Sequence, residues 1–301
     1  AQALRFGEWN WRWMLGVEAL PAIFYFFALL FVPESPRWLV MRGQDEKALG
    51  IMEQVSGREE AEAELAAVHA SIETEASEER APLRELFQPA MRLVLTIGIS
   101  VAILQQITGI NSVFFYAPMI FEQSGIGTDA AFMQAVLVGI VNLVFTVLAI
   151  LLIDKLGRRP LMLSGLTIIA VCMLLLAYGF GSATYSAGGE LQEINANLIL
   201  IGILGFVAGF AMSLGPVMWV LFSELFPNRV RGVAISFVGL INSSVSFLVQ
   251  LVFPWELENF GSSTTFLIYG LFAVAGLVIV FKLLPETKGR SLEELEAELV
   301  R

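Results

Sequence analysis

The sequence predicts an all-α membrane protein with seven transmembrane helices. Of its 301 residues, 56% are hydrophobic and only 15% are charged, whereas about 25% of the residues in a soluble domain are charged. A bilayer-spanning helix needs about 20 apolar residues. Six uncharged segments exceed that length: 93–121, 132–153, 160–189, 194–223, 232–255 and 259–281. A seventh span, Trp13 to Val32, is interrupted only by Glu18.

The basic residues predict the orientation of these spans. Sixteen of the 18 Lys and Arg residues follow the first, third, fifth or seventh span. The connections near 122–131, 190–193 and 256–258 contain neither residue type. Because Lys and Arg concentrate in cytoplasmic loops, we expect a multi-pass protein of the plasma membrane. Its first residue would be external and its carboxyl end cytoplasmic.

The chain divides into four regions by polarity: a span in 1–33, a hydrophilic linker in 34–91, a six-helix bundle in 92–285 and a tail in 286–301. Within the linker, the stretches DEKALGIMEQVSG and EAEAELAAVHASIETEA have helical spacing. They predict short helices beneath the membrane, although a charged connection with no other role fits equally well.

Charge and rare residues exclude several functions. The net charge of −10 is concentrated in the acidic linker. The sequence has no clustered basic face, so we do not expect a nucleic-acid partner. Cys172 and His69 are each the single residue of their type, which excludes a disulfide framework and a Cys/His zinc site. We expect no metal and no cofactor. The spans contain no HExxH motif, aspartate pair or Ser/His arrangement, so we do not expect an enzyme.

Two spans are irregular at matching positions of two three-helix sets. The first contains QQITGIN (105–111), and the second contains LGPVMW (214–219), with Gly215 and Pro216 in mid-span. Interrupted helices at corresponding positions of two halves are typical of a transporter binding site. The alternative is that these residues only kink or pack the helices.

The amides of QQITGIN favour a ligand rich in hydroxyl groups. In a regular helix Gln106 and Asn111 would point about 140° apart, but local unwinding at Thr108–Gly109 would turn both toward one cavity. Gln105, beside them, adds a third amide. Each amide has two donors and an acceptor, which suits neighbouring sugar hydroxyls, whereas an ion would favour carboxylates or converging carbonyls.

Three further side chains are candidates for the same cavity. Trp219 lies three residues after Pro216, and its indole has both an apolar face and a hydrogen-bond donor. Asn142 and Asn242 are two more amides within spans. Taken singly, each Asn is as well explained by hydrogen bonding between helices. Taken with the two interrupted spans, they favour a shared polar cavity.

Acidic and basic residues recur together at the predicted cytoplasmic ends of spans. Charge pairs at a cavity mouth close it in one conformation and separate in another. Topology alone would explain the bases, but not the adjacent acids. The candidates for this network are Glu34, Arg37, Asp154, Arg158, Arg159, Glu224, Arg229 and Arg231.

Together these stretches resemble the sugar porter family of the major facilitator superfamily. The resemblance rests on WRWMLGVEALPAI, VPESPRWL, QQITGINSVFFYAP, DKLGRRPLM, GPVMWVLFSELFPNRVRG and PETKGRSLEELE, in the family's order and spacing. The family has twelve helices in two halves. The resemblance implies that this chain corresponds to the sixth helix, the cytoplasmic linker and the last six helices. The missing partner would be the rest of the amino-terminal half.

The resemblance also implies roles for individual residues. Sugar hydroxyls would be bound at the positions of Gln105, Gln106, Asn111, Asn142, Trp219 and Asn242. Phe115 replaces a tyrosine found in many members, so no hydroxyl contact is expected from it. Glu18 lies within a span and resembles a glutamate near the proton-coupling aspartate of symporters. It is therefore a candidate for proton coupling.

The expected function is transport of a hexose or pentose by alternating access, coupled to protons in the full-length protein. A polyol or inositol transporter, a non-transporting sugar sensor and a truncated remnant of the same fold remain alternatives. A seven-helix receptor or photoreceptor fits the helix number and the external amino end. The paired interrupted helices argue against it, and Lys282 lies too near the end of its span to hold retinal.

Overall fold

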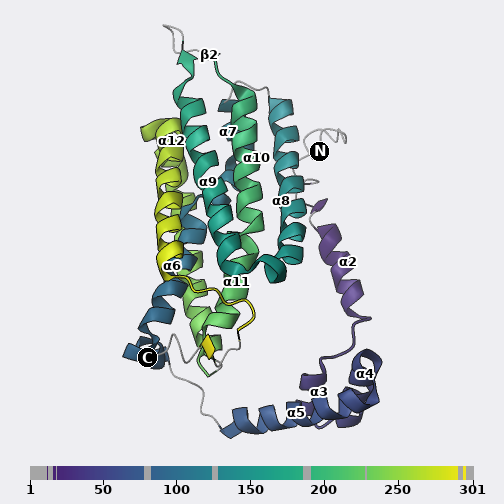
Figure 1. Cartoon of the computed structure of the whole chain (residues 1–301). Coiled ribbons are helices and arrows are strands. Elements are labelled where there is room, and N and C mark those ends of the chain that lie inside the picture. Colours follow the sequence, from purple (N-terminus) through teal and green to yellow (C-terminus); the bar gives the residue numbers. More distant parts are fainter. Residues whose placement is uncertain are drawn as a thin grey trace. The chain divides into compact units, whose positions relative to one another are not determined.

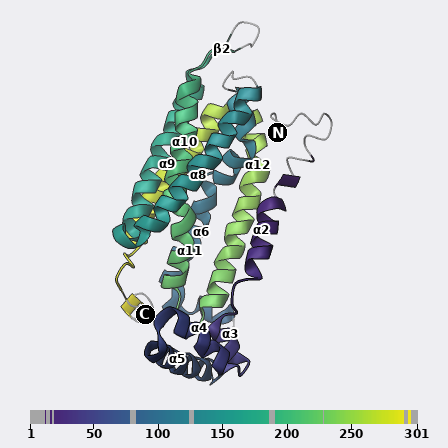
Figure 2. The same ribbon diagram turned by 90° about the vertical axis from the view of Figure 1, so that its right-hand side faces the viewer.

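A computed structural model shows a mainly helical chain that separates into two units, Ala1–Arg80 and Ala81–Arg301 (Figures 1 and 2). The structure describes residues 12, 16–17, 19–77, 83–123, 128–185, 191–227, 229–290 and 294–295. The first unit contains α2 (Ala19–Leu29), α3 (Pro36–Met41), α4 (Asp45–Ser56) and α5 (Arg58–Ser77). Both helices predicted in the linker are therefore present as α4 and α5.

The second unit is a bundle of long helices. It begins with the short 3₁₀ turns η2 (Leu83–Phe87) and η3 (Pro89–Met91). The helices are α6 (Arg92–Ile107), α7 (Ile110–Gln123), α8 (Thr128–Leu156), α9 (Arg158–Gly181), α10 (Ala196–Met212), α11 (Leu214–Leu225) and α12 (Arg231–Leu283). Two short antiparallel strands, β1 (Thr184–Tyr185) and β2 (Leu191–Glu193), lie between α9 and α10.

Two of the predicted spans are interrupted, as the sequence indicates. Residues 92–123 form α6 and α7, which are separated at Thr108 and Gly109. Gly109 has a φ of 86°, a left-handed conformation that glycine adopts without strain. Residues 196–225 form α10 and α11, which are separated at Ser213 with φ −129° and ψ −92°. Pro216 stands in the first turn of α11, where its missing N–H costs no hydrogen bond.

Helix α12 contains two segments that fold back on each other. Its 53 residues would span about 80 Å if straight, but Gly261 inside it has the non-helical angles φ 75° and ψ 163°. Across this turn the Tyr269 hydroxyl donates to Glu256 Oε2 at 2.9 Å, and the rings of Phe253 and Tyr269 stack with centroids 6.2 Å apart. The two segments therefore lie side by side.

This turn corrects one sequence prediction. A connection was expected near 256–258 because Glu256 and Glu258 interrupt the apolar run. The helix instead continues through both residues, and the chain turns at Gly261. Glutamate is a good helix former, so a charged residue alone does not end the helix, whereas a glycine with positive φ does.

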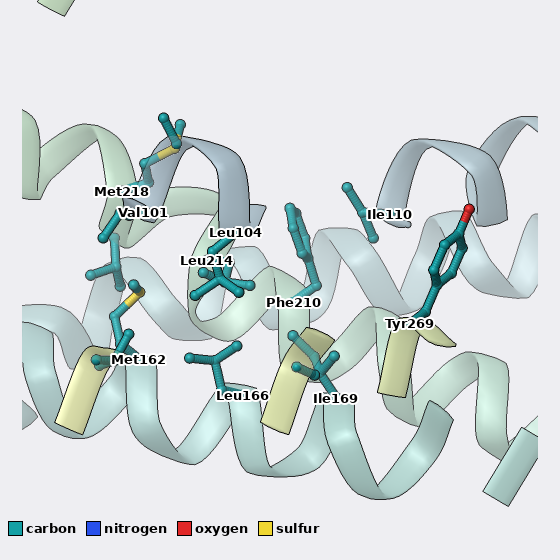
Figure 3. Packing of buried hydrophobic residues seen from close by; sticks show 14 of the residues in the cluster. Val101, Leu104, Ile110, Met162, Leu166, Ile169, Phe210, Leu214, Met218 and Tyr269 are labelled. Atoms are coloured by element: carbon teal, nitrogen blue, oxygen red, sulfur yellow. The ribbon is translucent and has the colours of Figure 1, made fainter. Parts of the chain in front are cut away.

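The core of the second unit lies among α6, α7, α9, α10, α11 and α12. Figure 3 shows part of it, where Leu166 and Ile169 of α9 lie near Phe210 of α10 and Leu214 of α11. Small residues allow the closest approach. A Cβ at Gly165 of α9 would collide with the side chain of Ser213 and lie 2.7 Å from the carbonyl oxygen of Gly209. Close contact through small residues is the usual packing mode of membrane helices.

Five helical segments of the described chain are long and apolar enough to cross a membrane: Pro89–Gln123, Met133–Leu156, Arg158–Gly181, Ala196–Leu225 and Arg231–Leu283. The last of these includes the fold-back at Gly261 and covers two of the predicted spans. Helix α2, within the predicted span Trp13 to Val32, is apolar but has only 11 residues. The number of seven spans thus remains a prediction.

We predict that Gly165→Ala destabilises the bundle. The added methyl group would overpack the contact between α9 and α10 and lower the free energy of unfolding by about 1–3 kcal/mol. The thermal unfolding midpoint of the detergent-solubilised protein measures this effect. Gly139→Ala in α8 is the matched control, because nothing lies within 4 Å of a Cβ there. Equal midpoints for the two variants would show that the contact is not tight.

Candidate functional site

The side chain of Gln106 lies at the centre of a group of hydrogen-bonded amides. Its Nε2 donates to Gln105 Oε1 at 2.8 Å and to Asn242 Oδ1 at 3.1 Å. Its Oε1 accepts a hydrogen bond from Asn111 Nδ2 at 2.8 Å. We call Gln105, Gln106, Asn111 and Asn242 the amide cluster. It joins α6, α7 and the first segment of α12.

Asn242 connects this cluster to the core of the bundle. Its Nδ2 donates to Gln105 Oε1 at 2.6 Å and to the carbonyl oxygen of Ala102 at 2.9 Å, and it contacts Met218 Sδ of α11 at 3.7 Å. Asn242, Gln105 and Gln106 are all buried. A buried amide without partners is costly, so mutual hydrogen bonding explains how these side chains are tolerated inside an apolar bundle.

The interruption of the helix brings the amides together. In a continuous helix Gln106 and Asn111 would diverge by about 140°, yet their side chains form a hydrogen bond of 2.8 Å. The change of direction at Gly109 accounts for the difference. The predicted convergence of these two amides is present in the structure.

Two polar residues that the sequence analysis did not select extend the cluster along α12. Ser246 Oγ accepts from Asn111 Nδ2 at 2.8 Å and from Gln250 Nε2 at 2.9 Å. Asn242, Ser246 and Gln250 follow one another at intervals of four residues, which places them on one face of a helix. This spacing is the signal in the sequence that would have identified both residues.

Two predicted members are not joined to the cluster by hydrogen bonds within the described part of the chain. Asn142 is half-buried on α8. Trp219 of α11 is 49% exposed, and its ring meets Phe222 edge-on with centroids 6.0 Å apart. The neighbouring Met218 points inward to Asn242 instead. Phe115, from which no hydroxyl contact was expected, is 70% exposed.

The cluster retains hydrogen-bonding capacity for a ligand. Asn111 uses its amide nitrogen for both Gln106 and Ser246, which leaves its Oδ1 as an acceptor. Gln106 Oε1 accepts a single bond from Asn111 within the described residues, although a carbonyl oxygen has two lone pairs. Half-buried Asn111, Ser246 and Gln250 therefore offer acceptors and a hydroxyl donor beside one another. Vicinal hydroxyl groups match this pattern.

A second cluster, at the end of the bundle where α8 meets α9, contains charged groups. Arg158 Nη2 lies 2.6 Å from Glu224 Oε1 of α11, and its Nε lies 3.1 Å from both oxygens of this carboxylate. Arg158 Nη1 also reaches Asp154 Oδ1 at 3.0 Å, and Thr287 Oγ1 donates to Glu224 Oε2 at 2.7 Å. We call Asp154, Arg158, Glu224 and Thr287 the charged cluster. These residues also line a cavity of about 590 Å³.

Glu286 connects this end of the bundle to the segment after α12. Its two carboxylate oxygens accept hydrogen bonds from the backbone N–H groups of Arg158 and Arg159 at 3.0 and 3.1 Å. These are the first two residues of α9, so a carboxylate caps the positive end of the helix dipole. Gly157 has a φ of 96°, and its Cβ would lie 2.7 Å from Glu286 Oε2. The glycine in DKLGRR thus makes room for the cap.

The other predicted charged residues have separate partners. Arg229 pairs with Glu85 at 2.9 Å, Arg231 Nε donates to the carbonyl oxygen of Phe226, and Arg159 Nη2 donates to that of Phe281. Glu34 and Arg37 belong to the first unit, so their role in the network remains a prediction. Glu18 lies outside the described residues.

The described residues contain no group of three His, Cys, Asp or Glu side chains that could hold a metal ion. The amide cluster and the charged cluster are the candidate functional features. The first suits a neutral polar ligand, and the second suits a contact that forms and breaks.

Comparison with known proteins assigns the chain to one family. The family described as "Sugar (and other) transporter" matches residues 2–299. Among curated proteins, the arabinose-proton symporter of Bacillus subtilis is 36% identical over 293 residues, which are 96% of this chain and 61% of the symporter. The D-xylose-proton symporter of Escherichia coli K12 is 38% identical over 301 residues, and the match covers 57% of it.

Solved structures give the same result. The proton:xylose symporter XylE bound to 6-bromo-6-deoxy-D-glucose matches with a TM-score of 0.71 and 36% identity, over 98% of this chain and 62% of that protein. The inward open conformation of XylE from E. coli matches with a TM-score of 0.72 and 35% identity, over 96% of this chain and 57% of that protein. The chain thus spans about three fifths of the length of these relatives.

We predict that Glu224→Gln destabilises the charged end of the bundle. Arg158 is only 11% exposed, so removing the charge of its partner should cost about 1–3 kcal/mol, less than for a fully buried pair. The loss would appear as a lower thermal unfolding midpoint in detergent. Glu85→Gln provides the control, because the more exposed pair with Arg229 should contribute at most about 1 kcal/mol. An unchanged midpoint for Glu224→Gln would contradict a structural role of the pair.

Proposed function

The chain belongs to the sugar transporter family of the major facilitator superfamily, and we propose that it forms the substrate-binding carboxyl-terminal part of a monosaccharide transporter. Family membership makes it a transport protein of the membrane rather than an enzyme. We further propose seven spans, with the segment after α2 and the end of the chain in the cytoplasm. The excess of Lys and Arg on that side supports this orientation.

The amide cluster is the observation that carries this proposal. Gln105, Gln106, Asn111 and Asn242 converge where a membrane helix is interrupted, and interrupted helices near the midplane are typical transporter binding sites. Trp219 and Asn142 would complete the site from α11 and α8. The substrate would be held by hydrogen bonds to its hydroxyl groups, with the indole of Trp219 against its C–H face.

The substrate is proposed to be a pentose or a hexose. Relatives described as arabinose-proton and D-xylose-proton symporters support this class. A cyclic polyol is the second candidate, because a major myo-inositol transporter of Bacillus subtilis is 36% identical over 286 residues. Both ligand types present neighbouring hydroxyl groups, so the amide cluster suits either. Transport would be coupled to protons as in these symporters, with Glu18 as a candidate coupling residue.

The missing partner would be the remaining helices of the amino-terminal half. Alternating access needs two halves that rock about a shared site, and the chain spans about three fifths of its relatives. The charged cluster would help to hold the cytoplasmic side closed when the site faces outward. Asp154, Arg158 and Glu224 already form one connected set of ion pairs, which charge-assisted contacts of a moving half could extend.

We predict that Gln106→Ala abolishes sugar binding by the complete gene product. The change removes the central amide, which bonds to Gln105, Asn111 and Asn242, and should lower the affinity at least about a hundredfold. Titration of the protein in lipid nanodiscs with D-xylose, L-arabinose and myo-inositol measures the effect. Trp219→Ala should weaken the binding of the same sugar.

Asn259→Ala is the matched control for these substitutions. Asn259 is an exposed amide of α12 whose Nδ2 donates to the carbonyl oxygen of Trp255, away from the amide cluster. Its loss should leave the affinity within about twofold of wild type. Affinity retained in Gln106→Ala would remove the amide cluster from the binding site, and binding of none of the three compounds by the wild type would contradict the proposed substrate class.

A further inference from the structure

Tyr269, in the second segment of α12, lies directly against the point where α6 ends and α7 begins. A Cβ at Gly109 would stand 2.5 Å from Cδ2 and Cε2 of the tyrosine ring. The ring is 2% exposed, and Figure 3 shows it in the apolar core near Ile110, the first residue of α7. Gly109 therefore meets two requirements, a positive φ and an absent side chain, and Tyr269 imposes the second.

The ring is held from its other sides as well. It stacks on Phe253 with centroids 6.2 Å apart and planes 21° apart, and Phe253 in turn packs against Tyr116 of α7 at 5.2 Å. Aromatic pairs prefer offset-stacked or edge-to-face arrangements, so these contacts favour one orientation of the ring. Tyr269 thus has a defined orientation beside the interruption at Thr108 and Gly109.

The hydroxyl of Tyr269 has a specific partner. It donates to Glu256 Oε2 at 2.9 Å, from the other side of the turn at Gly261. A phenylalanine would fill the same apolar space, so the hydroxyl is required only for this hydrogen bond. A hydrogen bond to a carboxylate is stronger than one between neutral groups. The Tyr269–Glu256 pair therefore fixes both the ring and the turn.

Ser112 adds an independent observation at the same place. It lies three residues after Gly109, in the first turn of α7, and it is fully buried. Its hydroxyl has no hydrogen-bond partner within the described residues. The same turn of α7 carries Asn111, which bonds to Gln106. A shift of this turn toward or away from Tyr269 would therefore alter the amide cluster.

We propose that Tyr269 is a positioning residue for the amide cluster. Its ring sets the angle between α6 and α7, and Glu256 holds the ring in place, so that Gln106 and Asn111 meet. This inference rests on the proposed sugar-binding role of the cluster. Within the described residues Tyr269 has no hydrogen bond to any of the four amides, so its effect on sugar affinity is transmitted through the position of α7.

The test is a double-mutant cycle on sugar affinity in the complete gene product in nanodiscs. Tyr269→Phe keeps the ring and removes the hydrogen bond, and Glu256→Ala removes its acceptor. The ligand is whichever of D-xylose, L-arabinose and myo-inositol the wild type binds. Each substitution should lower the affinity for this ligand by about five- to tenfold. The double variant should be no weaker than either single one, because both remove the same bond.

Two further variants separate positioning from a general loss of stability. Glu256→Gln keeps a carbonyl acceptor and should retain affinity within about twofold to threefold. Tyr178→Phe, at an exposed tyrosine of α9, should have no effect. Additive losses, or wild-type affinity in Tyr269→Phe, would overturn the inference. Loss of binding in Gln106→Ala together with unchanged binding in Tyr269→Phe would refute the positioning role and leave the proposed function intact.

A second readout does not depend on any sugar. Cys172 is the single cysteine of the 301 residues, so Cys172→Ala with Phe115→Cys leaves one thiol in them, on α7, and any cysteine elsewhere in the complete gene product would be replaced as well. If Tyr269 sets the direction of α7, Tyr269→Phe should change the rate of maleimide labelling at position 115 by at least about threefold. Tyr178→Phe should not change this rate. Equal rates in both would show that the hydroxyl of Tyr269 does not position α7.

Discussion

The interruption of the helix at Thr108 and Gly109 is the constraint on which the candidate site depends. A continuous helix would have kept its backbone hydrogen bonds but directed Gln106 and Asn111 to different neighbours. With Gly109 at a φ of 86°, the two side chains hydrogen-bond to each other, and each also reaches α12, at Asn242 and Ser246 respectively. The loss of regular helix is offset by side-chain bonds that only the interrupted geometry permits.

The packing around the interruption explains why it has one defined shape. Tyr269 lies against Gly109 from the core side, and Asn242 joins Gln105 and Ala102 from the first segment of α12. Both contacts come from a helix that folds back at Gly261. The first segment of α12 therefore makes a polar contact with α6, and the second makes an apolar contact where α7 begins. Moving either segment would move the amides.

The charged cluster follows a related principle at the end of the bundle. Arg158 is shared between Glu224 and Asp154, while Glu286 caps the first turn of α9. Arg158 and Glu224 keep 11% and 21% of their side-chain surface exposed, so the pair contributes less than a fully buried one, about 1–3 kcal/mol. In the proposed alternating-access cycle this pair would separate at that cost when the cytoplasmic side opens.

Much of the membrane bundle, and the convergence of Gln106 and Asn111, could be predicted from sequence because both depend on local pattern. Uncharged runs, a glycine between amides and a proline in mid-span act through the neighbouring residues of the chain. Contacts between distant segments could not be predicted in this way. The four-residue spacing places Ser246 and Gln250 on the same helix face as Asn242, but only the position of α12 beside α7 shows that this face meets Asn111. Tyr269 likewise meets Gly109, 160 positions earlier.

The turn at Gly261 and the exposure of Trp219 show the same limit of prediction from sequence. Glu256 and Glu258 suggested a connection, but residues with good helix propensity continued the helix until a glycine ended it. Met218 of α11 contacts Asn242, whereas the indole of Trp219 is half-exposed, so the place of Trp219 in the cavity stays a prediction. The end point of one helix and the rotation of another decide these positions, and composition fixes neither.

The most direct test of the central claim is a structure of the complete gene product with its monosaccharide bound. We predict that ring hydroxyls lie within about 2.7–3.2 Å of amide atoms of Gln106, Asn111 and Asn242, and that α6 and α7 remain separated at Gly109. A sugar bound elsewhere in the bundle, or a continuous helix through residues 105–111 in the bound state, would contradict this prediction.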